Sequence, residues 1–498
     1  MKLLPIVLAS ILPVVAQAQF TFITNNGSIT ITGYTGTNGT VVIPGVTNGY
    51  PVTSIGLGAF SNKIAMVAVT IPDSITNIGG SAFRVCKGLA SVTIGSNVLT
   101  IGSSAFRTCT NLSNIVIPDS VTMLGTNVFY NCTALNSITL GTHISGIPTT
   151  TFLACSKLTS IVIPDGVTDI GSEAFSECYA LTNAAVPNSV TDIGYNAFWH
   201  CSSLGSIALP SVTGIGVGAF NVCGLTSVSF GTNLANIGNG AFAECTVLTN
   251  VAIPDSVTNI AQSAFDNCHS LRNISLGAGV QTIGIVFNAC FSLTNITVNA
   301  NNLNYCSLDG VLFNRNQTSL IAYPPGRIGS YTIPNGTTNL GYWSFGDCPN
   351  LTSVAVPASV TNITSDAFGN SPNLTGVYFN GNAPTVTNDM SVFLADNNAT
   401  IYYLPETIGW GNTFDGRPAV LWNPQAQTGG DHFGILNNQF GFNVGGGSNL
   451  VFVLQACTNL ANPVWVPLST NVLSGGLVYF SDPQWTNFPS RFYKFSFP

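Results

Sequence analysis

Charged side chains are scarce in this sequence. Asp, Glu, Lys and Arg make up 6% of its 498 residues, whereas about 25% is usual in soluble proteins. The 12 Lys and Arg residues are too few for the basic stripe that binds phosphate backbones, and the net charge is −7. We therefore expect no nucleic-acid partner and no attraction to an anionic membrane surface.

Motifs of catalysis are also missing. The four histidines stand in no His-Glu-x-x-His arrangement, no Gly-x-Ser-x-Gly elbow lies near them, and no phosphate-binding glycine loop follows a strand. No Cys-x-x-Cys pair offers metal ligands. The sequence predicts a protein that is not an enzyme and that needs no cofactor or metal. Its histidines are His143, His200, His269 and His432.

The first 18 residues have the pattern of a secretory signal peptide. Lys2 is followed by an apolar stretch over residues 3–15 and by the small-x-small sequence Ala-Gln-Ala at 16–18. An anchoring helix is the alternative, but the apolar run is shorter than the roughly 20 residues that span a bilayer. We expect export, a mature chain beginning near Gln19, and no membrane insertion after the signal is removed.

A repeat of 22 or 23 residues dominates the rest. The motif Ala-Phe-x-x-Cys-x-x-Leu, or a close variant, recurs in register along the chain. Its phenylalanines are Phe60, Phe83, Phe106, Phe129, Phe152, Phe175, Phe198, Phe220, Phe242, Phe265 and Phe287, and after a step of 58 residues Phe345 and Phe368.

Each repeat contains a tight turn and two extended segments. Phe83, Cys86 and Leu89 are spaced by three, which suits a 3₁₀-like or single helical turn. Residues 92–94 alternate apolar and polar like a strand with one buried face, and residues 75–79 are a second extended segment. One repeat buries about six apolar side chains at about 2 kcal/mol each, less than the backbone entropy of ordering 23 residues at about 1–2 kcal/mol per residue. Repeats must therefore stack on one another.

This pattern resembles the BspA-like branch of bacterial leucine-rich repeat proteins. Residues 163–178 (IPDGVTDIGSEAFSEC) carry the resemblance in one stretch, and it extends over roughly residues 40–422. The resemblance implies a leucine-rich repeat solenoid, mainly β with a parallel sheet on its concave face and short helical turns. Members of that family are secreted or surface-exposed, and some are implicated in adhesion.

The repeat boundaries give a domain plan. After the signal peptide at 1–18 we expect an N-terminal β cap at 19–50, the solenoid at 51–422, a linker at 423–430 and a small all-β, sandwich-like module at 431–498. A hairpin is inserted near 299–334, either as a protruding recognition element or as a structural irregularity.

The cysteines follow the repeat. Equivalent positions of stacked coils have parallel side-chain directions, which fit disulfide geometry poorly, so we interpret the row as core packing. Cys306 and Cys457 lie off the row and are not assigned. The row consists of Cys86, Cys109, Cys132, Cys155, Cys178, Cys201, Cys223, Cys245, Cys268, Cys290 and Cys348.

The strand positions predicted to face outward are small and uncharged, which offers hydrogen bonds and shape without electrostatic steering. They are Ser91, Thr93, Asn114, Val116, Ser137, Thr139, Ser160, Val162, Asn183, Ala185, Asn250, Ala252, Asn273 and Ser275. The densest acidic group, on adjacent coils, suits either calcium or solvated turns. It comprises Asp165, Asp169, Glu173, Glu177 and Asp192.

An aromatic group is the candidate ligand-binding site. Tyr195 and Trp199 flank Phe198, with His200 beside them, and Tyr179 belongs to the coil before. Exposed Tyr and Trp anchor protein interfaces and stack on sugars, although isolated surface aromatics are also common. We expect a secreted or cell-surface binding protein that recognises an extracellular protein or polysaccharide, as an adhesin does. A structural envelope or matrix component without a discrete ligand is the alternative.

Overall fold

The computed structural model describes residues 19–386, 391–447 and 450–497. The signal peptide expected at residues 1–18 lies outside them. The chain divides into two compact units, Met1–Asn288 and Ala289–Pro498, which we call the N-terminal and C-terminal units.

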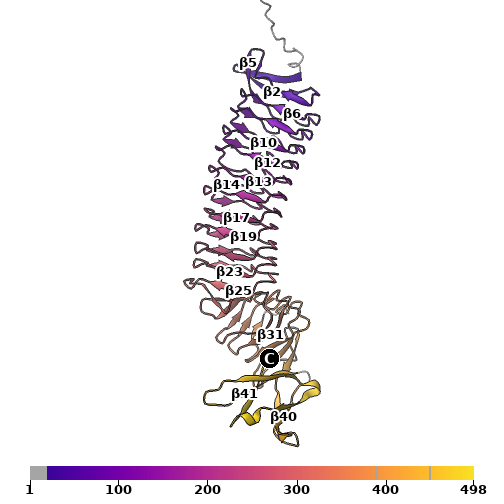
Figure 1. Ribbon diagram of the computed structural model, residues 1–498, viewed down its shortest axis with the longest axis vertical. Helices are drawn as coiled ribbons and strands as arrows, with labels where there is room; N and C mark the ends of the chain where they lie inside the picture. The colour runs from indigo at the N-terminus through magenta and orange to yellow at the C-terminus, as the bar shows by residue number, and fades with distance from the viewer. Residues whose placement is uncertain (1–18, 387–390, 448–449, 498) are drawn as a thin grey trace, which may run out of the picture. The chain divides into compact units, whose positions relative to one another are not determined.

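The N-terminal unit is a β-solenoid (Figure 1). Its coils each contribute a longer strand of three or four residues and a shorter strand of two, and strands of successive coils pair in parallel and in register, as Ile170 does with Ile193. The first coils are preceded by β1 (Phe20–Asn25), β2 (Ser28–Tyr34), β4 (Val46–Thr47) and β5 (Tyr50–Ile55), of which β1 pairs antiparallel with β2, and β2 pairs parallel with β5. The repeat periodicity therefore predicted the architecture correctly.

The longer strands lie along one side of the coils. They are β3 (Thr40–Val42), β6 (Ala68–Thr70), β8 (Ser91–Thr93), β10 (Asn114–Val116), β12 (Ser137–Thr139), β13 (Ser160–Val162), β15 (Asn183–Ala185), β17 (Ser206–Leu209), β19 (Ser227–Phe230), β21 (Asn250–Ala252) and β23 (Asn273–Leu276). The shorter ones are β7 (Asn77–Ile78), β9 (Thr100–Ile101), β11 (Met123–Leu124), β14 (Asp169–Ile170), β16 (Asp192–Ile193), β18 (Gly214–Ile215), β20 (Asn236–Ile237), β22 (Asn259–Ile260) and β24 (Thr282–Ile283).

The longer strands alternate as expected. In β10, Asn114 and Val116 are exposed while Ile115 between them is buried. The same holds for all fourteen positions predicted to face outward, so that prediction is confirmed. The outer surface of this strand row is a plane of small uncharged side chains.

The phenylalanine segment closes by successive tight turns. The amides of Arg84 and Cys86 donate to the carbonyls of Ser81 and Phe83, three residues back. Ser81 and Val85 have positive φ values of 56° and 60°, so these i→i+3 bonds do not continue into a helix. Alternate amides donate to the next coil, as that of Val85 does to the carbonyl of Arg107. The expected turn is present, and within the described residues 3₁₀ helices occur only after residue 473, as η2 (Ser474–Gly476) and η3 (Trp485–Asn487).

A glycine follows most of the shorter strands because the coils approach closely there. A Cβ added at Gly194 would lie 2.6 Å from the amide nitrogen of Ser172 in the preceding coil. No side chain fits into that distance, so the Ile-Gly pairs of the sequence mark the points of closest contact between coils.

Stacked phenylalanine rings form the centre of the N-terminal unit. From Phe60 to Phe265 each ring lies 5.0–5.8 Å from the next, with interplanar angles of 2–14°. This spacing is close to the distance between paired strands, about 4.8 Å, so coil stacking fixes the ring stacking. At the start of the row, Phe20 and Tyr34 contact the ring of Phe60 at 6.2 and 5.5 Å and cover it. The predicted hydrophobic spine is confirmed.

The cysteine row lies beside the rings. Its thiols are buried and free, and they donate to the carbonyl of the phenylalanine one coil earlier, as Cys86 does to Phe60 at 3.0 Å and Cys178 to Phe152 at 3.3 Å. The interpretation as core packing is confirmed.

The C-terminal unit contains further coils with an altered start. The shorter-strand sheet continues as β28 (Ser319–Ala322), β30 (Asn339–Leu340), β32 (Asn362–Ile363) and β34 (Thr385–Val386), and the longer-strand sheet as β29 (Gly329–Thr332), β31 (Leu351–Val356), β33 (Gly376–Phe379), β35 (Thr400–Tyr403) and β37 (Arg417–Leu421), with β36 (Thr413–Phe414) pairing antiparallel to β37. β25 (Asn295–Val298) precedes them.

The expected hairpin lies at the start of these coils. β27 (Val311–Asn314) pairs antiparallel with β28, and a third strand that the sequence did not suggest, β26 (Tyr305–Leu308), pairs with β27. Val311, Phe313 and Leu320 are fully buried in the core of the unit. The hairpin therefore packs as part of the solenoid, which favours the structural interpretation over a protruding element.

The end of the chain forms an all-β module, residues 425–497. Strands were predicted at 450–455, 465–468, 477–481 and 491–497, and the structure has β41 (Val451–Cys457), β42 (Val466–Val472), β43 (Leu477–Asp482) and β44 (Phe492–Ser496) there. Three further strands are β38 (Gln425–Gln427), β39 (Gly434–Leu436) and β40 (Gln439–Gly445). β38 lies inside the segment expected as a linker and pairs with β40.

The module packs on the last coils of the same unit. Tyr378 and Tyr402, on adjacent longer strands, stack at 4.8 Å, and Phe497 contacts Tyr378 at 4.8 Å and Trp422 at 4.5 Å. Trp422 also donates its indole N–H to the carbonyl of Val451 at 2.9 Å. The module therefore covers outward-facing aromatic side chains at this end of the solenoid.

Candidate functional site

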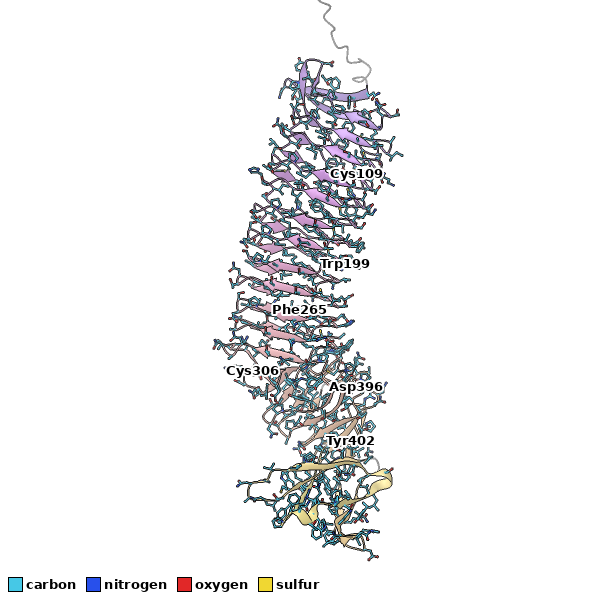
Figure 2. The ribbon with its side chains drawn as sticks, in the orientation of Figure 1. Cys109, Trp199, Phe265, Cys306, Asp396 and Tyr402 are labelled. Atoms are coloured by element: carbon cyan, nitrogen blue, oxygen red, sulfur yellow. The ribbon has the colours of Figure 1, made fainter. Side chains whose placement is uncertain are left out.

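The four candidate aromatic residues lie in the phenylalanine segments of two adjacent coils. Trp199 directly follows the core residue Phe198, and His200 comes next with a left-handed φ of 61°. Tyr179 follows the row cysteine Cys178 in the coil before. Figure 2 marks Trp199 at the flank of the coil stack and Phe265 within it.

Three of the four residues form one cluster. The imidazole of His200 lies between the other two, with its centroid 5.1 Å from the ring of Tyr179 and 5.1 Å from that of Trp199. Both contacts are edge-on, with interplanar angles of 88° and 61°, the geometry that aromatic quadrupoles prefer. We call Tyr179, Trp199 and His200 the aromatic cluster.

Tyr195 does not join the cluster. Its ring is 50% exposed and, among the described residues, stacks on none of the other three rings. Its main-chain carbonyl accepts the amide of Glu173 at 2.7 Å. The structure therefore supports three of the four candidates as one surface feature and leaves Tyr195 as a separate exposed ring.

Trp199 is held in place by the next coil. Its indole Nε1 donates to Oδ1 of Asn221 at 3.2 Å. Because that donor is already used, Trp199 has its aromatic surface to offer to a ligand. Asn221 occupies the same repeat position, one residue after a core phenylalanine, so the contact is part of a ladder that runs from coil to coil.

Electrostatics at the cluster are mildly acidic. The pKa of Tyr179 is raised, mainly by partial burial and then by the charge of Glu177 and a hydrogen bond to it. Tyr179 is 38% exposed and stays a neutral phenol at ordinary pH. The cluster thus combines a phenol, an imidazole and an indole next to a carboxylate, a set suited to stacking and hydrogen bonding and not to covalent chemistry.

The acidic group on these coils does not form a cation site. Asp169 and Asp192 are in register on β14 and β16, but each accepts the hydroxyl of the threonine before it, at 3.2 and 2.8 Å. In the part of the chain that the structure describes, no three His, Cys, Asp or Glu side chains come together as a metal ion would require.

The cysteine row offers no nucleophile in this state. Burial raises the pKa of Cys86 to about 11 and that of Cys132 to about 12, so the thiols stay protonated. Off the row, Cys306 is partly exposed and donates to the carbonyl of Asn314 at 3.2 Å, while Cys457 is buried in the module.

Sequence reasoning missed two further aromatic contacts. Arg107 lies over the ring of Tyr130 at 4.5 Å, at the repeat position of Trp199 and Asn221. Tyr342, 49% exposed, lies beside Trp343 with 6.3 Å between centroids. The first pair was predictable, because both residues directly follow core phenylalanines and equivalent positions of adjacent coils must touch.

Stacked coils, two parallel strand rows and a surface without a catalytic arrangement define a leucine-rich repeat solenoid of the bacterial type. The model of the BspA type leucine rich repeat region matches residues 43–157, 123–245, 191–318 and 322–409. These matches cover most of the chain, and the chain belongs to this family. The resemblance seen in the sequence is thereby confirmed.

Solved structures agree on the fold. A leucine-rich repeat protein from Bacteroides ovatus is 20% identical, with a TM-score of 0.51, over 81% of this chain and 98% of that one. A leucine rich cell surface protein from Faecalibacterium prausnitzii is 26% identical over 78% of this chain and 88% of that one, with a TM-score of 0.29. A leucine rich repeat protein of T. pallidum is 30% identical over 38% and 88%, with a TM-score of 0.37.

A search of curated proteins gives no match to this chain. Within residues 19–386, 391–447 and 450–497, no helix is long and apolar enough to cross a bilayer.

Proposed function

We propose that this chain is a non-catalytic binding protein, exported to the cell surface or released, which recognises an extracellular protein or polysaccharide through its solenoid. Membership of the BspA family supports a binding role, since the family model describes repeats and no enzymatic domain. Export is supported by the signal-peptide pattern of residues 1–18, which lie outside the described part. The F. prausnitzii neighbour is itself described as a cell surface protein.

The aromatic cluster carries the proposal. It is the place in the N-terminal unit where partly exposed Tyr, His and Trp rings contact one another across two coils, beside a strand row of small uncharged side chains. Aromatic rings lose little entropy on binding and present large apolar faces, so they anchor protein and sugar ligands. The indole is already oriented by Asn221, which lowers that cost further.

The test is a screen of the full chain against immobilised extracellular matrix proteins and polysaccharides. We expect at least one ligand to be retained and its binding to fall at least tenfold with Trp199→Ala. Tyr130→Ala is the matched control, because Tyr130 occupies the same repeat position in another coil. Binding that survives Trp199→Ala would remove the cluster from the proposal.

A structural role in an envelope or matrix is the second candidate. The small uncharged side chains of the outer strand row would let neighbouring molecules pack without charge repulsion. Concentration-dependent self-association in analytical ultracentrifugation, together with no hit in the ligand screen, would favour this role over ligand binding.

A further inference from the structure

The C-terminal module contains a cavity that the solenoid does not explain. It has a volume of about 890 Å³, within the range of ligand-binding pockets. β42 and β43 form two of its walls, and the segment from Pro483 to Arg491 contributes the rest of the mouth. We call this opening the seam.

Both strands at the seam are sheet edges. Among the described residues, β42 pairs with β41 alone and β43 with β40 alone. The two strands follow one another in the chain but belong to different sheets, so neither uses its outer row of amides and carbonyls to pair with the other. Free edges of this kind accept an added strand. Pro467 removes a donor from β42, which makes β43 the better acceptor of a strand.

Apolar side chains at the seam are unusually exposed. Val464 and Val466 are 76% and 54% exposed at the mouth. Tyr479 on β43 and Phe488 on the facing segment are also exposed and line the same cavity. Apolar side chains gathered at an open sheet edge mark an interaction surface.

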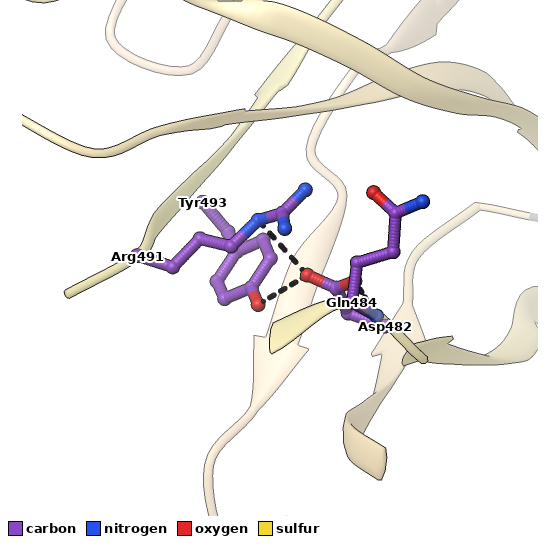
Figure 3. Close-up of polar contacts among 4 residues, drawn as sticks. All are labelled: Asp482, Gln484, Arg491 and Tyr493. Carbon is purple, nitrogen blue, oxygen red and sulfur yellow. Dashed lines mark hydrogen bonds and ion pairs between the residues drawn. The ribbon is translucent and has the colours of Figure 1, made fainter. Parts of the chain in front are cut away.

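A buried cation at the cavity has unused hydrogen-bonding capacity. Arg491 pairs through Nε with Oδ2 of Asp482 at 3.0 Å, and the two side chains are 9% and 3% exposed. The same Oδ2 accepts the hydroxyl of Tyr493 at 2.8 Å, and Oδ1 accepts the amide of Gln484 at 2.9 Å (Figure 3). Asp482 is thus fully used, whereas Nη1 of Arg491 is buried without any partner in the described residues. Such an orphan donor costs about 1–3 kcal/mol, and an acceptor oxygen from a ligand would remove that cost.

We propose that the seam binds an extended peptide segment of another protein, which adds a strand to the free edge of β43 and places a carbonyl or carboxylate oxygen against Arg491. Main-chain bonds to β43 would supply affinity. Alternate side chains of the segment would cover Val464, Val466 and Phe488. The seam then differs from the aromatic cluster in both unit and ligand chemistry, so the two proposals fail independently.

The test uses the full chain and an array of synthetic decapeptides that alternate valine and threonine, with one glutamate moved through every position. We expect retained peptides that share a glutamate position and lose binding at least tenfold when alternate amides are N-methylated. Val466→Lys should cause a similar loss, since lysine on an edge strand blocks strand addition. Val162→Lys, at an exposed strand position of the N-terminal unit, is the matched control and should leave binding unchanged.

Several outcomes would overturn the proposal: no retained peptide, retention insensitive to both N-methylation and Val466→Lys, or retention of oligogalacturonate in place of peptides. Self-association of the unmodified chain that Val466→Lys abolishes would assign the seam to a second copy. Arg491→Lys keeps a cation beside Asp482 and so preserves the fold. It should weaken retained peptides about tenfold, by loss of the guanidinium donor.

Discussion

The position three residues after each core phenylalanine differs between the two units. In the N-terminal unit it is cysteine in every coil from Cys86 to Cys268, whereas in the C-terminal unit it changes from Cys348 to Ser371 and then to Asp396. Ser371 makes the bond that the thiols make, from Oγ to the carbonyl of Phe345 at 2.9 Å. Asp396 accepts the amide of Ser371 through Oδ1. One geometric slot therefore holds a thiol, a hydroxyl or a carboxyl group.

The comparison shows what the row requires. A coil needs a small group here that satisfies the main chain of its neighbour, and the polarity of that group is secondary. Polarity has an energetic consequence, however, since Oδ2 of Asp396 is buried without a hydrogen-bond partner in the described residues and burial raises the pKa of its carboxyl to about 7. The uniform thiol row carries no such pH-dependent cost.

The largest expected effect comes from the ring stack that both units share. Phe198 is fully buried between Phe175 and Phe220, at 5.0 and 5.2 Å. Phe198→Ala should lower the free energy of unfolding by about 3–5 kcal/mol, by lost burial and the cavity left behind. Denaturant unfolding followed by circular dichroism measures it, with Tyr195→Ala as the exposed control. A loss below about 1 kcal/mol would contradict a continuous spine.

A second prediction concerns the carboxyl group in the slot. Because the pKa of Asp396 is raised in the folded state, its favourable neutral form is lost as pH rises, and stability should fall between about pH 4 and pH 7. Asp396→Asn should remove this dependence and raise stability at pH 8, on the order of 2 kcal/mol after allowance for screening. Thermal unfolding across pH measures it, and the exposed Asp431→Asn serves as control. An unchanged pH profile for Asp396→Asn would show that another group titrates.

A third prediction exchanges residues across the comparison. Cys201 donates to the carbonyl of Phe175 at 3.2 Å, as Ser371 does to Phe345. Cys201→Ser should therefore cost about 1 kcal/mol, because the bond is kept while apolar burial is reduced. Cys201→Ala, which loses the donor as well, should cost more. If both variants were equally destabilised in chemical unfolding, the thiol bond would contribute nothing.

The smallest predicted effect is a gain. Val85 holds a φ of 60°, which strains a β-branched residue. Equivalent positions in other coils carry Asn131, Asn267 and Asn370 with φ of 57–59°. Val85→Asn should stabilise by about 0.5–1 kcal/mol, measured as a higher melting temperature. Val162→Asn, in an extended strand, should not share the gain.

Much of the fold was predictable because the repeat imposes it. The phenylalanine spacing predicted the spine, and the alternation around Ile115 predicted which strand face is exposed. The left-handed residues such as Val85 were not predictable, since side chains of every type occupy that position and the constraint comes from bonds to the adjacent coil. The module was predicted in part: four of its strands have apolar runs, whereas β38 and β39 are short and polar or exposed.

The candidate site was predicted less completely. Proximity in sequence placed Trp199 beside His200, and the repeat period brought Tyr179 near them. Tyr195 was grouped with them by sequence distance alone, and its backbone directs it elsewhere. The seam could not be foreseen, because it depends on which strands pair in the module and on the burial of Arg491, which no local pattern encodes.

The ladder of residues that directly follow the core phenylalanines has a consequence for how this surface changes over time. Arg107 with Tyr130, and Trp199 with Asn221, show that a side chain at this position is oriented by its counterpart 22 or 23 residues later. A new recognition residue therefore requires a compatible neighbour one coil further along. Specificity on such a surface would be inherited in pairs of adjacent repeats, and duplication of two coils together would copy a working contact intact.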